Sequence, residues 1–313
     1  GWRWAGILFA FFTIAASFGI GNMVQGNAIS MLCYSTYDIS PYITASVITA
    51  VTALVLLFGL KGISSVCSMF VPFMALLYVL GCLYILFVNG AYVWEALCLI
   101  IKSAFSPKAA GGGFVGTTII MTARYGIARG LFSNESGMGS APIVAAAAQT
   151  RNPVRQALVS SSATFWDTVV ICALTGLTIV SSILAYPEIS HTAGGTLTQL
   201  AFEKIPYVGA PLLTFGIVTF AFSTIIGWSY YGEKCAEYLG GSRMRFPYRI
   251  VYVVMVFVGA IVKLELVWNL SDLLNAFMAI PNLLSVLLLS AVVVSETKRY
   301  LWSGHLDDYP RNG

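Results

Sequence analysis

The feature that most constrains this chain is a series of apolar runs, each long enough to cross a lipid bilayer as a helix. About 20 apolar residues suffice for one crossing, because a helix rises about 1.5 Å per residue and the hydrocarbon core is about 30 Å thick. The 313 residues are 58% hydrophobic and 10% charged, whereas a soluble domain is about half apolar and about a quarter charged. The sequence therefore predicts an all-α, multi-pass integral membrane protein. It excludes a soluble enzyme, a disordered chain and a disulfide scaffold.

The apolar runs predict about eight transmembrane helices in a single transmembrane domain covering residues 1–313. The predicted spans are residues 5–33, 43–60, 66–89, 114–149, 154–184, 207–231, 248–268 and 272–297. The fourth is too long and too rich in glycine to be one simple span. Pro281 beside Asn282 predicts a kink in the last span. Residues 92–105 carry Glu95 and Lys102 and predict an amphipathic helix at the membrane interface.

The basic residues predict the orientation of the chain in the membrane. Eleven of the 17 lysines and arginines lie on the side that holds both termini, and four lie on the other side. Loops on the cytoplasmic side of a membrane carry the excess of lysine and arginine. We therefore expect a multi-pass protein of the cell (inner or plasma) membrane, with both termini of this chain in the cytoplasm. The net charge of +4 follows this topology and indicates no nucleic-acid partner.

The residue types that enzymes use for nucleophilic or metal chemistry are scarce. The six cysteines are scattered without a CxxC pair, and His191 and His305 are the two histidines. A membrane-embedded enzyme built on Ser133, Glu135 and Asp167 would have no histidine as its general base. The sequence therefore favours a protein that is not an enzyme and has no resident cofactor.

Residues 133–139 read SNESGMG and interrupt the fourth apolar run with two glycines among polar side chains. Ser140 followed by Pro142 predicts the start of a second, alanine-rich helix. Non-helical backbone at membrane depth is tolerated where it is buried or lines a cavity. One interpretation is thus a discontinuous helix whose freed N–H groups face a substrate carboxylate and whose freed carbonyls face a cation. The alternative is a complete span at 113–132 followed by a cytoplasmic turn.

Two pairs of polar side chains lie in the sixth span. Thr219 and Ser223 are four residues apart and share a helix face, as do Thr224 and Trp228. A sodium ion is a hard cation that prefers oxygen ligands, so Thr219 and Ser223 are candidate sodium ligands. The alternative is that these hydroxyls bond their own backbone or assist helix packing.

Two carboxylates and two amides complete the polar residues predicted within the membrane. Asp167 lies in the fifth span and Glu135 lies in the interruption of the fourth. Because an intramembrane carboxylate is energetically expensive, each is expected either to line a pathway or to anchor a loop. Asn22 and Gln25 lie among glycines in the first span, where a polar pathway and close helix packing are both consistent with the sequence.

Several of these stretches together resemble one known family. They are ASFGIGNMVQGNAIS, GLFSNESGMGSAPIVAAAAQT, NPVRQALVS, WDTVVICALTGLTIV, FAFSTIIGWSYYGEKCAEYLGG and VWNLSDLLNAFMAIPNLLSVLLLS. In this order along nearly the whole chain they resemble the sodium:alanine symporter (amino acid carrier) family.

The resemblance implies sodium-coupled uptake of a small neutral amino acid such as alanine or glycine. It implies a LeuT-like inverted repeat of five plus five helices, with substrate and ion near the midplane beside two broken helices. Thr224 and Trp228 would then line the substrate pocket, and Thr219 and Ser223 remain the candidates for sodium. The second broken helix, which contacts the substrate, would include Ser133, Asn134, Gly137 and Gly139.

The chain resembles the last two thirds of such a symporter, because members of the family begin with about three further helices. The first broken helix, and with it half of the expected ligands, belongs to that earlier part. Two other functions stay open, a proton-coupled amino acid transporter in which Asp167 or Glu135 titrates and a non-transporting membrane fragment or scaffold. The sequence does not predict the oligomeric state.

Overall fold

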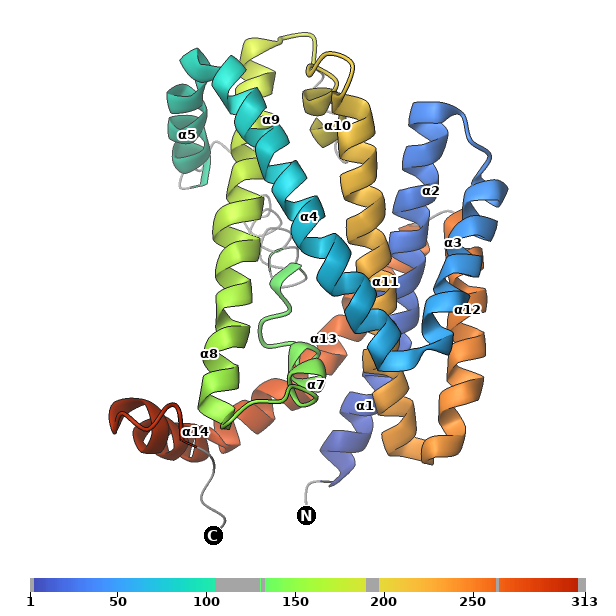
Figure 1. Cartoon of the computed structure of the whole chain (residues 1–313), viewed down its shortest axis with the longest axis vertical. Coiled ribbons are helices and arrows are strands. Elements are labelled where there is room, and N and C mark those ends of the chain that lie inside the picture. The colour runs from blue at the N-terminus through green and yellow to red at the C-terminus, as the bar shows by residue number, and fades with distance from the viewer. Residues whose placement is uncertain (1–2, 105–129, 131–132, 190–196, 263–264, 309–313) are drawn as a thin grey trace, which may run out of the picture. The chain divides into compact units, whose positions relative to one another are not determined.

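The computed structural model describes residues 3–104, 130, 133–189, 197–262 and 265–308, and the regular structure in these ranges is helical throughout (Figure 1). The chain divides into two compact units. Unit 1 comprises Gly1–Cys67, Glu135–Thr164 and Ala221–Gly313, and unit 2 comprises Ser68–Asn134 and Phe165–Phe220.

Six helical stretches of the described residues are long and apolar enough to cross a membrane, which confirms the predicted all-helical membrane protein. They are Arg3–Tyr37, Gly59–Val88, Pro153–Ala185, Gly209–Gly240, Ser242–Ile261 and Val267–Leu288. The predicted second span is a shorter helix, α3 (Pro41–Leu57). Most of the predicted fourth span, residues 114–129 and 131–132, lies outside the described residues. The count of eight spans therefore remains a prediction.

An apolar stripe runs along α4 (Gly59–Val88) on the face that other described residues leave open. Its members repeat every three or four residues and are Phe73, Leu76, Leu80, Leu83 and Phe87. A soluble protein rarely exposes so continuous an apolar surface. The stripe is the surface expected of a helix that contacts lipid.

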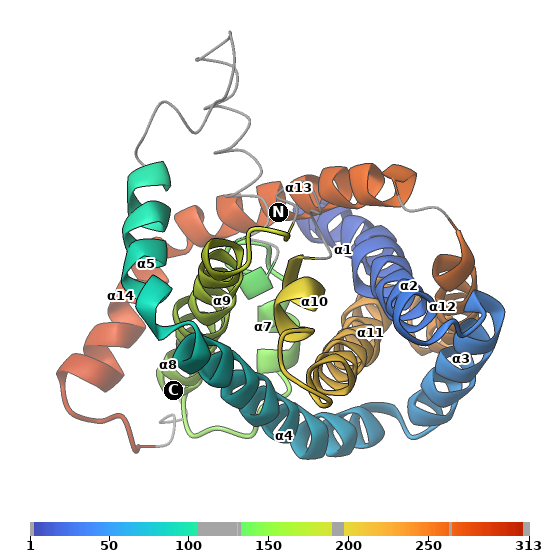
Figure 2. The ribbon, with the colours of Figure 1, turned by 90° about the horizontal axis from the view of Figure 1, so that it is seen from above.

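In unit 1, the first long helix is built from α1 (Arg3–Phe18), the π-helix η1 (Gly19–Met23) and α2 (Val24–Tyr37) without a break. The helix α12 (Arg245–Ile261) packs on η1, α2 and α3, while α13 (Glu265–Leu288) packs along α1 and η1. Figure 2 shows α13 beside α1, and α12 beside α2 and α3. The segment η1 thus lies between α12 and α13.

The predicted end of the seventh span at residue 268 is wrong, because α12 ends at Ile261. Val262 has an extended backbone, with φ −92° and ψ 150°. The Asn27 side chain donates hydrogen bonds to the carbonyls of Gly259 (3.1 Å) and Val262 (2.8 Å), which satisfies acceptors that a helix end leaves free.

The helix α11 (Gly209–Gly240) continues for nine residues beyond residue 231, the predicted end of the sixth span, whose place in a membrane remains a prediction. The additional turns are polar and pair with α12, the next helix of the hairpin in Figure 1. Arg249 donates to both oxygens of Glu233 at 2.6 and 2.9 Å, and Arg245 pairs with Glu237. These ion pairs join α11 to α12 at this end of the hairpin.

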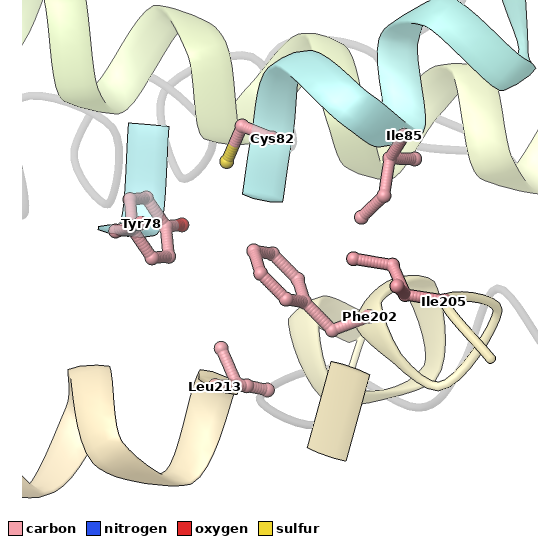
Figure 3. Packing of buried hydrophobic residues seen from close by; sticks show 6 residues of the cluster. All are labelled: Tyr78, Cys82, Ile85, Phe202, Ile205 and Leu213. Atoms are coloured by element: carbon pink, nitrogen blue, oxygen red, sulfur yellow. The ribbon is translucent and has the colours of Figure 1, made fainter. Parts of the chain in front are cut away.

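Unit 2 has its own apolar cluster. Tyr78, Cys82 and Ile85 share one face of α4 and meet Phe202, the last residue of α10 (Leu197–Phe202), as Figure 3 shows. The rings of Tyr78 and Phe202 are stacked with centroids 5.5 Å apart. Leu213 of α11 closes the cluster.

Unit 2 also contains a short helix, α5, and an ion pair that follows α9. The predicted amphipathic helix at 92–105 corresponds to α5 (Gly90–Ala104), which packs against α9 (Ala173–Ala185), and its place at the membrane interface remains a prediction. After α9, Lys204 Nζ lies 2.7 Å from Glu188 Oε1, and this hydrogen bond lowers the pKa of the exposed Glu188 carboxyl.

Candidate functional site

Residues 135–140 form a non-helical turn at the position where the sequence predicts an interruption. Glu135, Gly137 and Gly139 have positive φ angles of 55°, 78° and 88°. Side chains are strained in this left-handed region and glycine is not, so the two glycines permit the turn. The first half of the predicted discontinuous helix lies mainly outside the described residues, and the depth of the turn in a membrane therefore remains a prediction.

The helix that follows the turn is shorter than the sequence predicts. α7 (Ala141–Ala145) has five residues, after which Ala147 and Ala148 bond to carbonyls three residues back, in tight turns. The Ser140 hydroxyl does not cap this helix, because it donates to Glu135 Oε2 at 2.8 Å. The predicted start of this helix is therefore confirmed, whereas its predicted continuation through the alanine run is wrong. α7 is too short to provide the anion-binding terminus expected of it.

Asn282 of α13 binds the backbone of the turn. Its Nδ2 donates to the carbonyl of Gly137 at 2.9 Å. A Cβ at Gly139 would lie 2.7 Å from Phe9 Cε2 and 2.8 Å from Asn282 Cγ, so the turn lies directly against both side chains. Beside it is a cavity of about 320 Å³, lined by Ala5, Gly6, Phe9, Gly139, Pro142, Ile143, Pro281, Asn282 and Ser285.

Tyr231 of α11 connects the turn to the predicted substrate residues. Its hydroxyl is a hydrogen-bond partner of the Glu135 carboxylate. Its ring meets the indole of Trp228 edge-on, with centroids 5.4 Å apart. Trp228 is buried, and Thr224, one turn earlier, is half-buried. In unit 1, Glu135 and Trp228 thus contact the same tyrosine.

The two candidate sodium ligands lie on α11 but in different units, Thr219 in unit 2 and Ser223 in unit 1. Both are half-buried. The Thr219 hydroxyl donates to the carbonyl of Phe215 at 2.7 Å, which is the backbone bond expected of a threonine in a membrane helix. Such a hydroxyl still has lone pairs that a cation can use.

Unit 2 joins Ser133 and Asn134 to a second π-helix, η3 (Phe165–Cys172). The Ser133 hydroxyl lies 2.9 and 2.8 Å from the two oxygens of Asp167, to which it donates. Asn134 Nδ2 donates to Thr168 Oγ1 at 3.2 Å. Both side chains that the resemblance assigns to the second broken helix therefore meet the same turn of η3. Asp167 is half-buried there and has a polar partner.

Asn22 and Gln25 make structural contacts with backbone. Asn22 is fully buried and donates from Nδ2 to the carbonyl of Tyr252 at 2.7 Å. Gln25 is half-buried and donates to the carbonyl of Ile20 at 3.2 Å. These contacts correspond to the packing alternative for this segment.

Three residues of these arrangements were not anticipated as partners from the sequence: Thr168, Tyr231 and Tyr252. The sequence indicated Asn282 as part of a kinked helix, and its bond to Gly137, 145 residues away, has no local signal. Among the described residues, no three His, Cys, Asp or Glu side chains form a group that could hold a metal ion. The oxygen atoms available near these helices belong to hydroxyls, backbone carbonyls and the carboxylates of Glu135 and Asp167.

Comparison with known proteins gives consistent matches along the chain. The sequence profile of the sodium:alanine symporter family matches residues 1–310. The sodium/alanine symporter AgcS of Methanococcus maripaludis is 48% identical over 94% of this chain and 64% of its own length. An uncharacterized transporter of Haemophilus influenzae is 45% identical over 100% of this chain and 69% of its own length. The probable sodium/glutamine symporter GlnT of Bacillus subtilis is 36% identical over 95% of this chain and 62% of its own length.

The chain thus spans about two thirds of the length of the relatives that it matches. The family profile covers almost every residue, and the described part has six helices able to span a membrane. The chain is a multi-pass membrane protein and belongs to the sodium:alanine symporter family.

Proposed function

We propose that the protein is a secondary active transporter that carries a small neutral amino acid, alanine or glycine, together with sodium across the cell membrane. The observation that carries this proposal is the 48% identity to a sodium/alanine symporter over 94% of the chain. No covalent chemistry is required, so transport needs binding and conformational change and no catalytic group. The fold we propose for the whole protein is a LeuT-like inverted repeat.

In this proposal, Thr224 and Trp228 of α11 line the amino acid site. The segment from Ser133 to Gly139 supplies backbone carbonyls for the ammonium group of the substrate, while Thr219 and Ser223 supply hydroxyl oxygens to sodium. Tyr231 supports the arrangement, because it contacts both Glu135 and Trp228. Sodium and amino acid would each raise the affinity for the other by the same factor, because coupling between binding sites is reciprocal.

Proton coupling is the second candidate, and one relative favours it. The putative sodium/proton-dependent alanine carrier YrbD of Bacillus subtilis is 29% identical over 96% of this chain. In that case Asp167 of unit 2 or Glu135 of unit 1 is the candidate carboxylate for titration. Asp167 accepts two close contacts from Ser133, and Glu135 accepts a bond from Ser140.

The test is uptake of labelled alanine by cells that express the full reading frame containing this chain, in sodium buffer and in choline buffer. Sodium-dependent accumulation above that of cells without the protein is the expected result. Equal uptake in both buffers that rises as the outside pH falls would show that protons, and not sodium ions, drive the transport. No uptake, with the protein present in the membrane, would contradict amino acid transport.

Ser223→Ala tests the sodium assignment separately. We expect it to raise the sodium concentration for half-maximal uptake by about fivefold, the effect of losing about 1 kcal/mol of binding. The matched control is Ser229→Ala on the same helix, since the Ser229 hydroxyl is buried and donates to the carbonyl of Ile226 at 2.6 Å. An unchanged sodium dependence in Ser223→Ala would remove Ser223 from the site.

A further inference from the structure

Trp228 lies directly against the backbone of the π-helix η1 at Gly21. A Cβ at Gly21 would lie 2.3 Å from both Cβ and Cγ of Trp228 and 2.7 Å from Cδ2. Real Cβ atoms do not approach other heavy atoms so closely, so this contact requires glycine. Gly21 and Trp228 are both buried, and Trp228 is 4% exposed.

Tyr252 of α12 fixes the two backbone segments on which this contact depends. Its hydroxyl donates to the carbonyl of Ile225 at 2.7 Å and lies 3.3 Å from the carbonyl of Gly21. Ile225 precedes Trp228 by less than one helical turn. One buried hydroxyl therefore joins the helix that carries the indole to the backbone against which the indole packs. Asn22 in turn donates to the carbonyl of Tyr252 at 2.7 Å.

The π-helical geometry makes this connection possible. In η1 the N–H of Val24 bonds to the carbonyl of Gly19, five residues earlier. The longer repeat shifts the hydrogen-bond ladder, and the carbonyls of Ile20 and Gly21 accept bonds from the side chains of Gln25 and Tyr252. A π-helical turn at such a contact is frequently part of a functional site.

We propose that Gly21 and Tyr252 are positioning residues for Trp228, and that by fixing its indole they set the size of the side chain that the amino acid site accepts. The inference rests on the proposed function, in which Trp228 lines that site. If the Trp228 indole cannot move, the site excludes a substrate whose side chain is one methylene longer, and a rigid apolar pocket discriminates between two such substrates by about 10- to 200-fold. If the indole can move, the longer substrate also fits and the discrimination between the two substrates falls.

Tyr252→Phe tests the proposal, because it removes the hydroxyl and keeps the ring. The measurement is KM for sodium-dependent uptake of alanine and of its one-carbon-longer homologue, 2-aminobutyrate. We expect the ratio of the two KM values, homologue over alanine, to fall about fivefold when the buried hydrogen bonds are lost. A role in folding alone would lower the amount of transporter and the maximal rate, and would leave this ratio unchanged.

Tyr248→Phe is the matched control. Tyr248 lies one turn earlier on α12, is 5% exposed and places its hydroxyl 2.8 Å from Ser17 Oγ. The Tyr248→Phe variant therefore loses a buried hydrogen bond of the same kind, while the bonds to Gly21 and Ile225 are kept. We expect its KM ratio to stay within about twofold of the wild-type value.

An unchanged ratio in Tyr252→Phe, or an equal fall in Tyr248→Phe, would overturn the positioning role while leaving amino acid transport intact. If the Tyr252→Phe variant is not found in the membrane, Trp228→Phe is measured in its place. Its smaller ring should also lower the ratio of the two KM values, because it leaves more room for the longer substrate. An unchanged ratio there would show that Trp228 does not limit size. Absence of sodium-dependent uptake by the wild type would instead overturn the proposed function, and this inference with it.

Discussion

The π-helices η1 in unit 1 and η3 in unit 2 each interrupt a long apolar helix, but they are stabilised in different ways. In η1, Ile20, Gly21 and Asn22 are buried, and helices α12 and α13 both pack against the segment. In η3, none of the eight residues is buried within the part of the chain that the structure describes. Its polar contacts include the hydrogen bonds that Asp167 and Thr168 accept from Ser133 and Asn134.

The comparison indicates two uses of the same backbone irregularity. Burial makes η1 a fixed support, since moving it would require repacking of both α12 and α13. Hydrogen bonds at a half-exposed segment can be exchanged for bonds to a ligand or to water at small net cost, because each contributes only about 1 kcal/mol. We therefore expect η1 to be the rigid support of the site and η3 to be the segment that responds to ligands.

Gly21→Ala should have the largest effect, because the new Cβ would overlap Trp228. We expect the free energy of unfolding to fall by about 3 kcal/mol, the upper range for overpacking, and uptake to be lost. Thermal unfolding of the purified protein measures this. Gly216→Ala on α11 is the control, since its Cβ would meet Tyr78 at an ordinary 3.8 Å. Equal melting temperatures for the two variants would show that η1 is not tightly packed.

Asp167→Ala should have the next largest effect, and mainly on transport. It removes the acceptor of the Ser133 hydroxyl at a half-exposed position, so we expect a stability loss of about 1 kcal/mol and a fall in alanine uptake of about tenfold. Asp167→Asn keeps an oxygen that accepts this bond and removes the charge. Full uptake by Asp167→Asn would exclude Asp167 as a proton carrier, and full uptake by Asp167→Ala would remove η3 from the transport site.

Asn22→Ala should affect stability more than substrate affinity. It deletes a fully buried side chain and its bond to the carbonyl of Tyr252, which we expect to cost about 1–2 kcal/mol. The melting temperature should fall while KM for alanine changes less than about twofold. A large change in KM without a change in melting temperature would indicate that Asn22 contacts the substrate, contrary to a purely supporting η1.

Thr168→Val should have the smallest effect, because the bond that it removes is 3.2 Å long and lies in an exposed environment. We expect a loss of stability below about 0.5 kcal/mol and a change in KM below about twofold. The measurements are the melting temperature and the KM for alanine uptake of the wild type and of the variant, whose side chains at position 168 have nearly the same shape. A tenfold change would place Thr168, and not Asp167, at the centre of the η3 contacts.

The helical architecture could be predicted from the sequence because length and hydropathy decide whether a segment spans a membrane. The ends of the helices could not, since they depend on distant partners. α12 ends where Asn27 binds its last carbonyls, and α11 continues because Glu233 and Glu237 pair with α12. Hydropathy carries no information on such contacts.

The candidate site was predictable to a similar extent. The glycines of the turn at 135–140 are recognisable, because Gly137 and Gly139 adopt backbone angles that favour glycine. The partner of that turn, Asn282, depends on the approach of two helices far apart in the sequence. The two π-helices were not predicted, since GIGNM and FWDTVVIC share no pattern of composition that distinguishes them from α-helix.

Hydrogen–deuterium exchange of the full-length protein in lipid nanodiscs, with and without sodium and alanine, tests the contrast between η1 and η3 most directly. Peptides covering residues 19–23 should exchange slowly under both conditions. Peptides covering residues 165–172 should exchange faster without ligand and become protected when sodium and alanine are added together. Protection that rises at 19–23 and not at 165–172, or ligand-independent exchange in both segments, would contradict the account.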